Sequence, residues 1–167
     1  ICITIEYGVV NDIHPQITQI TTVGVPELIK KLKIMTSHGA EWLVLETTIH
    51  GLAQHRVWGI PYSVAVMTNV THEHLDFHGT FENYLQAKLE LFRITNRNKN
   101  GLQTGIINAQ DPNAEIFKNA VKYPVTYGVG QGDLQAKSIK QTPAGSEYTA
   151  EIGEDEYQIT CHLPGSV

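Results

Sequence analysis

The chain has 167 residues, of which 41% are hydrophobic and 17% are charged, and its formal net charge is -5. This length is enough for one packed domain with a small appendage. The negative charge argues against non-specific nucleic-acid binding, because no basic stripe is present to neutralise phosphates. No apolar run approaches the roughly 18 residues of a membrane helix. We therefore expect a cytoplasmic monomer with neither a nucleic-acid nor a membrane partner.

The first residues, ICITIEYG, do not form a signal peptide, because they lack a basic start. They look like a strand without an initiating methionine, so we expect the chain to be a fragment of a longer protein. The two cysteines, Cys2 and Cys161, lie at opposite ends of the chain. A disulfide framework is not expected from them, and buried thiols in strands are the simpler interpretation.

The first third of the chain mixes strand and helix patterns. Alternation over residues 1–7, and more weakly over 16–20, predicts a β-hairpin or a strand followed by a loop. Residues 26–38 have a proline in the first turn and apolar side chains at helical spacing, which predicts a helix. The apolar run 41–45 is typical of a buried parallel strand, and residues 51–57 are expected to form a short helix.

The middle of the chain alternates strand and helix patterns more regularly. We expect strands at 62–67, 104–109 and 125–127, and helices at 81–94 and 112–121. This alternation predicts an α/β fold with a mostly parallel, doubly wound sheet.

The helix expected at 81–94 has a clear start signal. Thr80 is a candidate N-cap, and Glu82 in the first turn suits the helix dipole. The buried face is expected to consist of Leu85, Leu89, Leu91 and Phe92.

The pattern changes after Gly128. Segments 135–141, 147–152 and 156–162 alternate apolar and polar residues between glycine-bearing turns, which predicts a small antiparallel β-unit. We therefore divide the chain into an α/β core at residues 1–128 and a β subdomain at 129–167.

Chemistry is concentrated in residues 69–88, where three histidines and two carboxylates, Glu73 and Asp76, precede the helix expected at 81–94. In open parallel sheets, the loops that leave the carboxyl ends of strands form the ligand crevice. Histidine and carboxylate are also common metal ligands. The alternative is a solvated polar loop with surface histidines.

A zinc hydrolase is a second interpretation of the same histidines. The run His72-x-His74-x-Asp76-x-His78 is one residue longer than the H-x-H-x-D-H run of metallo-β-lactamase-like hydrolases, and zinc favours imidazole. That signature also needs distant histidines and a different sheet sandwich.

Two long segments resemble the central, ATP-binding domain of the Mur ligases, most closely the MurE type. LETTIHGLAQHRV at 45–57 is similar to the family's E-V-S-S-H-G-L-x-Q-H-R-V, and TNVTHEHLDFHGTFENYLQAK at 68–88 to its T-N-L-x-x-D-H-L-D-Y-H-G-x-x-x-x-Y-x-x-A-K. IINAQDP at 106–112 resembles the strand end N-A-D-D. The resemblance implies a P-loop-NTPase-like fold and a truncated central domain over residues 1–167. The family's phosphate loop would precede Ile1, and its amino-terminal and carboxy-terminal domains are absent.

The chain departs from the family pattern at four positions. Ile49 replaces a serine, Ile20 stands where an asparagine contacts substrate, Gln110 replaces an aspartate, and Glu73 stands in place of another aspartate.

The resemblance implies an ATP-dependent ligase of peptidoglycan precursor synthesis. Such an enzyme adds the third amino acid to UDP-N-acetylmuramoyl-dipeptide through an acyl phosphate, with ATP and Mg²⁺ as cofactors. Glu46, His74 and a carbamylated Lys88 would hold magnesium, and His74 and Lys88 would be catalytic. Muramoyl-substrate contacts are expected from Thr21, Thr22, Thr48, Gln54 and Arg56, and a nucleotide contact from Asn108.

Several of these side chains also have simpler interpretations. Glu46 could cap a helix, Arg56 could be a surface arginine, and Asn108 could cap a turn at a strand end. His50, His55, His72 and His78 are expected to be structural, and Asp76 is a candidate to orient a neighbouring histidine. Without a phosphate loop, the fragment by itself is expected to be inactive and to bind ATP poorly, so a non-catalytic scaffold or binding module is the alternative for it.

Overall fold

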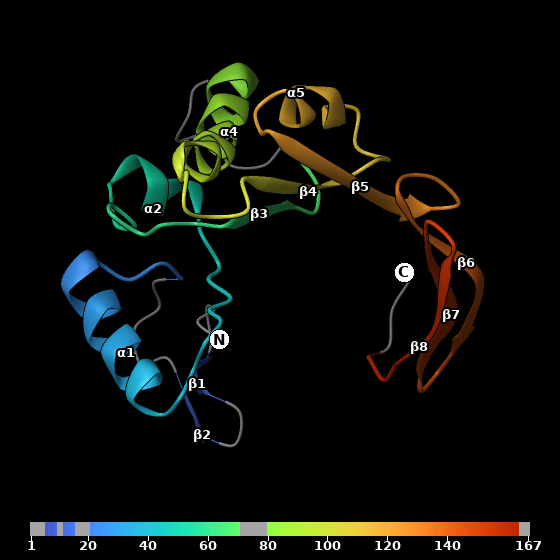
Figure 1. Cartoon of the computed structure of the whole chain (residues 1–167), viewed down its shortest axis with the longest axis horizontal. Coiled ribbons are helices and arrows are strands. Elements are labelled where there is room, and N and C mark those ends of the chain that lie inside the picture. The colour runs from blue at the N-terminus through green and yellow to red at the C-terminus, as the bar shows by residue number, and fades with distance from the viewer. Residues whose placement is uncertain (1–5, 10–11, 16–20, 71–79, 164–167) are drawn as a thin grey trace. The chain divides into compact units, whose positions relative to one another are not determined.

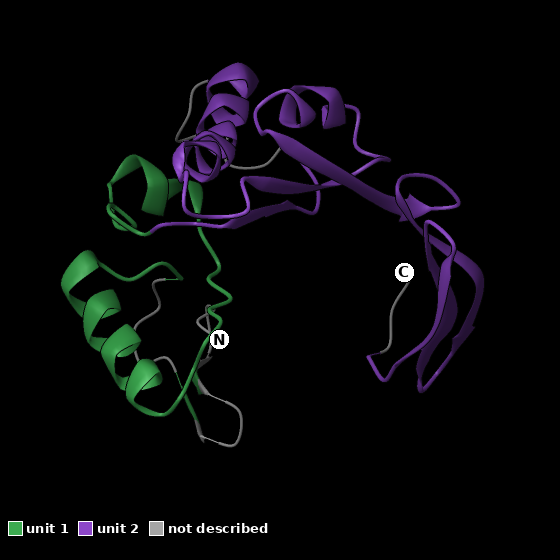
Figure 2. Cartoon of the chain, in the orientation of Figure 1, with its two compact units in different colours: residues 1–60 green, residues 61–167 purple. Residues whose placement is uncertain are grey.

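The computed structural model describes residues 6–9, 12–15, 21–70 and 80–163 (Figure 1). The chain divides into two compact units, residues 1–60 and residues 61–167 (Figure 2). No helix in the described part of the chain is both long and apolar enough to cross a lipid bilayer.

Unit 1 begins with a hairpin. Strand β1 (Glu6–Val9) pairs antiparallel with β2 (Asp12–Pro15), so a hairpin is present, but its second strand lies before the expected segment 16–20. Residues 16–20, expected as its second strand, lie outside the described residues. Helix α1 (Val25–Ser37) follows, with proline in its first turn and with Leu28 and Met35 buried.

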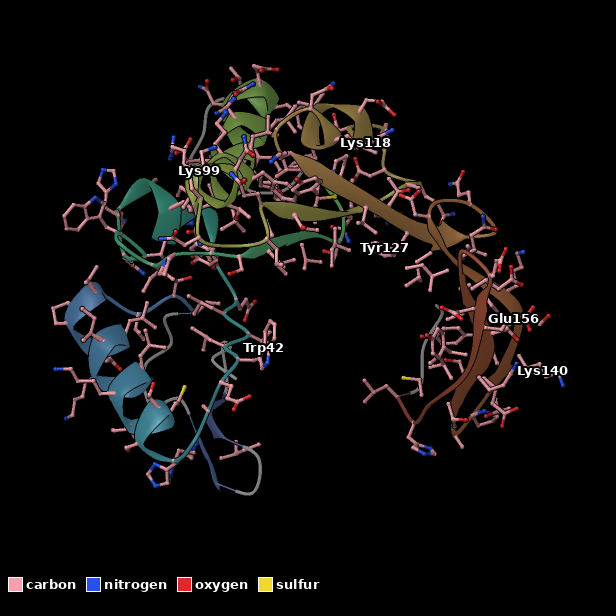
Figure 3. The ribbon with its side chains drawn as sticks, viewed as in Figure 1. Trp42, Lys99, Lys118, Tyr127, Lys140 and Glu156 are labelled. Atoms are coloured by element: carbon pink, nitrogen blue, oxygen red, sulfur yellow. The ribbon has the colours of Figure 1, made fainter. Side chains whose placement is uncertain are left out.

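The prediction of a buried strand at 41–45 is wrong. This segment has no strand beyond a single bridge at Leu45. Trp42, labelled in Figure 3, is 79% exposed, and Val44 is 66% exposed. An apolar run becomes a buried strand only where other strands and helices cover it, and the described residues supply no such cover here.

Helix α2 (Ile49–Ala53) begins and ends earlier than the expected helix at 51–57. Its start is set by Thr48, whose side chain accepts a hydrogen bond from the Gly51 backbone N–H at 3.1 Å. The residues that follow Ala53 form turns instead of helix.

Unit 2 is built on a six-stranded sheet in the order β3-β4-β5-β6-β7-β8. Strands β3 (Val64–Met67), β4 (Thr104–Asn108) and β5 (Tyr123–Val129) are parallel. Helices α4 (Phe81–Arg97) and α5 (Ala114–Lys118) connect them. The predicted α/β class with a mostly parallel sheet is confirmed, although α5 is shorter and β5 longer than expected.

The two connecting helices lie on the same face of the sheet (Figure 1). The strand order follows the chain order, and right-handed crossovers that progress in one direction place their helices on one face. Because the three strands are parallel, their carboxyl ends meet at one edge of the sheet.

Helix α4 packs against β3 and β4. It begins after Thr80, which accepts a hydrogen bond from the Asn83 N–H at 3.2 Å, as predicted for an N-cap. Leu85, Leu89 and Phe92 are buried, whereas Leu91 is only half-buried. The rings of Phe92 and Phe117 lie edge to face with centroids 4.9 Å apart, which joins α4 to α5. Gly105 on β4 makes this possible, because a Cβ there would lie 2.8 Å from the Phe92 ring.

Strands β6 (Leu134–Thr142), β7 (Gly145–Ile152) and β8 (Asp155–Cys161) form the predicted antiparallel β-unit. They continue the same sheet, because the start of β6 pairs in parallel with the end of β5. The Cys161 thiol is half-buried, so the expectation of a buried thiol is wrong there, and Cys2 lies outside the described residues.

Candidate functional site

The residues predicted to form the site fall into two described groups, one in each unit, and a third group that is not described. Unit 1 carries Thr21, Thr22, Glu46, Thr48, Gln54 and Arg56, and unit 2 carries Lys88 and Asn108. The residues His72, Glu73, His74, Asp76 and His78 lie outside the described residues.

The centre of the unit 1 group is the hydroxyl of Thr22, which is 1% exposed. It accepts a hydrogen bond from the Thr48 backbone N–H at 2.9 Å and lies 3.1 Å from the Thr48 hydroxyl. The same hydroxyl donates a hydrogen bond to the Glu46 carbonyl at 3.2 Å. These bonds tie the segment before α1 to the segment that enters α2, so two of the predicted substrate contacts are joined directly.

Gly51 allows this close approach. A Cβ at Gly51 would lie 2.8 Å from the Thr22 Cβ, a distance at which one of the two backbones has to shift. Helix α2 can therefore pack on Thr22 only if its third residue has no side chain.

Arg56 is directed back toward Thr22 by the turn that ends α2. The His55 N–H bonds to the Leu52 carbonyl, and the Arg56 N–H bonds to the Gly51 carbonyl. His55 has a positive φ of 54°, so the turn is a Schellman motif with histidine in the left-handed position. The Arg56 guanidinium then donates to the Thr22 carbonyl at 3.0 Å and to the Gln54 side chain. The backbone conformation of His55 thus forms the turn that ends α2.

Glu46 has an exposed side chain at the start of the same loop. A carboxylate in this place offers oxygen atoms to a hard cation. In the described part of the chain, however, no three His, Cys, Asp or Glu side chains are grouped so as to hold a metal ion.

In unit 2, Lys88 lies on α4 beside the exit of β3. Its Nζ donates to the Asn69 carbonyl at 3.2 Å and is 5.1 Å from the centroid of the Tyr84 ring. The contact with Tyr84 confirms that the two side chains share one face of the helix.

Asn108 stands at the carboxyl end of β4 and has two partners. Its Nδ2 donates to the Thr68 carbonyl at 2.8 Å, and its Oδ1 accepts from the Gln110 N–H at 2.9 Å. The second bond is that of a turn cap, the simpler interpretation of this residue. Gln110, at the family's aspartate position, accepts a bond from the Val129 N–H at 3.0 Å and so joins this turn to the end of β5.

Asp111 is a residue of this edge that the sequence did not single out. Its carboxylate accepts from the Val70 N–H at 2.6 Å and from the Asn113 backbone and side chain at 2.8 and 3.0 Å. The D-P-N pattern signals a local turn, which accounts for the bonds to Asn113. Nothing in that pattern signals the bond to Val70, 41 residues earlier.

Tyr127 of β5, labelled in Figure 3, lies at the same edge of the sheet. Its hydroxyl donates to the Met67 carbonyl at 3.4 Å. Burial raises the pKa of the Tyr127 phenol above its usual value.

Comparisons with known proteins give one consistent result. The family model for the Mur ligase middle domain matches residues 2–167. The UDP-N-acetylmuramoyl-L-alanyl-D-glutamate–2,6-diaminopimelate ligase of Clostridium tetani (strain Massachusetts / E88) is 36% identical over 149 residues, which are 88% of this chain and 29% of that protein.

Solved structures agree. A structure of a UDP-N-acetylmuramoyl-L-alanyl-D-glutamate–2,6-diaminopimelate ligase superposes with a TM-score of 0.75 and 29% identity, over 91% of this chain and 32% of that one. The MurF ligase of Thermotoga maritima in complex with ADP shares the fold at a TM-score of 0.50 and 22% identity, over 60% of this chain and 23% of that one.

The chain thus spans about three tenths of the length of the diaminopimelate ligases that it matches. The match to the middle domain nevertheless covers almost every residue, and it includes both segments that hold the predicted site. The chain belongs to the Mur ligase middle domain family.

Proposed function

We propose that the protein containing this chain is an ATP-dependent ligase of peptidoglycan precursor synthesis. It adds the third amino acid to UDP-N-acetylmuramoyl-dipeptide through an acyl-phosphate intermediate. The observation that carries this proposal is the match to the middle domain over residues 2–167, together with relatives named for diaminopimelate addition to this dipeptide. The same match favours a ligase over a zinc hydrolase. We also propose that the enzyme acts in the cytoplasm.

Magnesium is the metal that this reaction needs, since it neutralises charge on the phosphoryl group that is transferred. Mg²⁺ prefers oxygen ligands, and the exposed carboxylate of Glu46 fits that preference. We propose that Glu46 and His74 hold one magnesium ion and that a carbamylated Lys88 holds a second.

The carbamate is needed because a protonated lysine cannot bind a cation. A lysine ammonium group carries a positive charge and has no lone pair to offer a metal ion. In the neutral form, its nitrogen attacks the carbon of CO₂, an N–C bond forms, and the nitrogen releases a proton. The product is an anion with two oxygen atoms that still keeps one N–H for the Asn69 carbonyl.

The remaining side chains would bind and orient substrates. We propose that Thr21, Thr22, Thr48, Gln54 and Arg56 contact the muramoyl substrate and that Asn108 contacts the nucleotide. The guanidinium of Arg56 and the amide of Gln54 are hydrogen-bonded to each other, so they would act on the substrate as one preformed group.

The test is an assay of the complete protein with ATP, Mg²⁺, UDP-N-acetylmuramoyl-dipeptide and single amino acids, beginning with 2,6-diaminopimelate. Release of ADP and phosphate is expected only when both the dipeptide and one amino acid are present, with one new amide bond per ADP. Phosphate release that needs neither substrate, or no product with any amino acid, would show the proposal to be wrong.

A further inference from the structure

The peptide group between Asn69 and Val70 is hydrogen-bonded at both of its polar ends. Its carbonyl oxygen accepts from the Lys88 Nζ at 3.2 Å. Its N–H donates to the Asp111 Oδ2 at 2.6 Å. One peptide plane, just beyond the end of β3, therefore lies between a lysine on α4 and a carboxylate from the β4–α5 loop.

A peptide group is planar and trans, so its N–H and its carbonyl point in opposite directions. The plane can turn only as a whole, and an acceptor that fixes the N–H also fixes the direction of the carbonyl. The carboxylate of Asp111 thus sets where the acceptor of Lys88 lies, although the two side chains are on opposite sides of the backbone.

The carboxylate is well suited to fix this peptide. Asp111 is 9% exposed and Val70 is 7% exposed, so the bond between them is shielded from water, where hydrogen bonds to charged groups are strong. The other oxygen of Asp111 is held by both donors of Asn113. The acceptor cannot rotate away without losing all three bonds.

The neighbouring residue is held in the same way. The Asn108 side chain donates to the Thr68 carbonyl at 2.8 Å. Side chains from three places in unit 2 thus hold the three consecutive residues Thr68, Asn69 and Val70.

We propose that Asp111 is a positioning residue for Lys88, acting through the Asn69–Val70 peptide. It holds the carbonyl that receives the N–H of Lys88, and thereby directs the Lys88 nitrogen and any group attached to it. The hydrogen-bond geometry does not depend on the function proposed above, whereas the consequence for catalysis rests on it.

The decisive variant is Asp111→Asn in the complete protein. It places an NH₂ group or a weaker, neutral oxygen against the Val70 N–H, and either choice weakens the bond. Hydrogen exchange of the Val70 amide, followed by NMR, is expected to become about tenfold faster or more. The kcat is expected to fall about tenfold to hundredfold, while KM for ATP and for the dipeptide substrate changes little, because a misplaced Lys88 affects the reaction and not the binding.

The matched control is Asn98→Asp, which disturbs the opposite end of β3. The Asn98 Nδ2 donates to the carbonyls of Pro61 and Tyr62 at 3.2 and 3.0 Å. In this variant, too, the side-chain group that bonds to the backbone is replaced by one of the opposite hydrogen-bonding type. A comparable loss of stability is therefore expected. It should leave kcat and Val70 exchange unchanged.

Asp111→Glu is the second variant, in case Asp111→Asn does not fold. It keeps the charge but lengthens the side chain by one methylene, so an intermediate fall in kcat is expected. Unchanged Val70 exchange in the folded Asp111 variants would overturn the proposed geometry. If the Asp111 variants show faster Val70 exchange but the same kcat as Asn98→Asp, the positioning role would be overturned. If the wild-type protein makes no amide bond, the proposed function and the catalytic role fail together, whereas the Val70 amide still decides whether Asp111 fixes the peptide.

Discussion

At the scale of single residues, the side chain of Lys88 can act in two different ways. As an ammonium group it is a donor to the Asn69 carbonyl, and as a carbamate it would be a metal ligand. The variants Lys88→Arg and Lys88→Ala distinguish these roles. Arginine keeps the charge and the donors but cannot be carbamylated, and alanine removes both functions.

Both Lys88 variants of the complete enzyme are therefore expected to lose activity by at least about a hundredfold. Small carboxylic acids should partly restore Lys88→Ala, because they can place a carboxylate in the space left by the side chain. In labelled bicarbonate, a carbamate carbon signal should appear for wild type and be absent from both variants. Full activity of either variant would rule out the carbamate.

Gly51 is the second residue whose role can be measured. Gly51→Ala forces a Cβ to within 2.8 Å of the Thr22 Cβ, so a loss of about 1–3 kcal/mol in the free energy of unfolding is expected. Urea unfolding followed by circular dichroism measures this loss, because the chain's two tryptophans, Trp42 and Trp58, are already 79% and 77% exposed in the folded state and their fluorescence would change little. Gly24→Ala is the control, since its Cβ would meet only Pro26 at 4.0 Å. Equal midpoints for the two variants would contradict the close approach.

Residue types and spacing predicted part of the site. The four-residue spacing predicted correctly that Lys88 shares a face with Tyr84. The family pattern gathered Thr22, Thr48 and Arg56, and the structure joins them by hydrogen bonds. The role of Asp111 could not be predicted, because its partner Val70 is distant in sequence and contributes a backbone atom. A backbone N–H is present in nearly every residue and leaves no sequence signal.

At the scale of elements, strong local signals gave the better predictions. Helix α4 has a cap, a favourable first turn and an amphipathic face, and it begins where these signals place it. The segment 41–45 had only its apolar composition, and that composition does not say which neighbours will cover it. Helix α2 was misplaced because its cap, Thr48, lies in a run with a second threonine and the turn after it has no glycine.

The turn that ends α2 contains a residue in an unfavourable backbone conformation. His55 occupies the left-handed position that glycine prefers, which costs a non-glycine residue about 1–2 kcal/mol. His55→Gly is therefore expected to stabilise unit 1 by up to about 1 kcal/mol, after the greater flexibility of glycine in the unfolded chain is subtracted. His50→Gly, inside α2, should instead destabilise it by about 1 kcal/mol. Circular dichroism in urea measures both, and a lower midpoint for His55→Gly would refute the strain.

At the scale of the whole chain, the sheet of unit 2 changes from parallel to antiparallel at β6. The short connection between β5 and β6 is fixed by Asp133. Its carboxylate accepts from both the backbone N–H and the hydroxyl of Thr126 at 2.7 Å. The backbone bond, followed by the hydroxyl bond, lowers the pKa of Asp133 below its usual value of 3.8.

The lowered pKa in the folded state determines how the stability of the protein changes with pH. Asp133 stabilises the fold at pH values above its unfolded pKa, and this contribution is lost as the pH falls through its folded pKa. The difference in unfolding free energy between wild type and Asp133→Asn is therefore expected to be small but measurable at pH 7 and to shrink below about pH 4. Circular dichroism in urea at both pH values is the measurement. Asp155→Asn, at the start of β8, is the control, and a difference independent of pH would contradict the assignment.

The order of the strands also affects how the protein can fold while it is being synthesised. Strand β3 pairs only with β4 among the described strands, and Val64 lies opposite Thr104, about 40 residues later. At about 5–20 residues per second, a ribosome takes about 2–8 s to make the intervening segment. Strands β7 and β8, in contrast, are joined by a turn of two residues and can pair as soon as both have emerged. The amino-terminal strand of this sheet is thus the one that must wait for its partner, and it is the strand whose unpaired edge a chaperone would have to protect during translation.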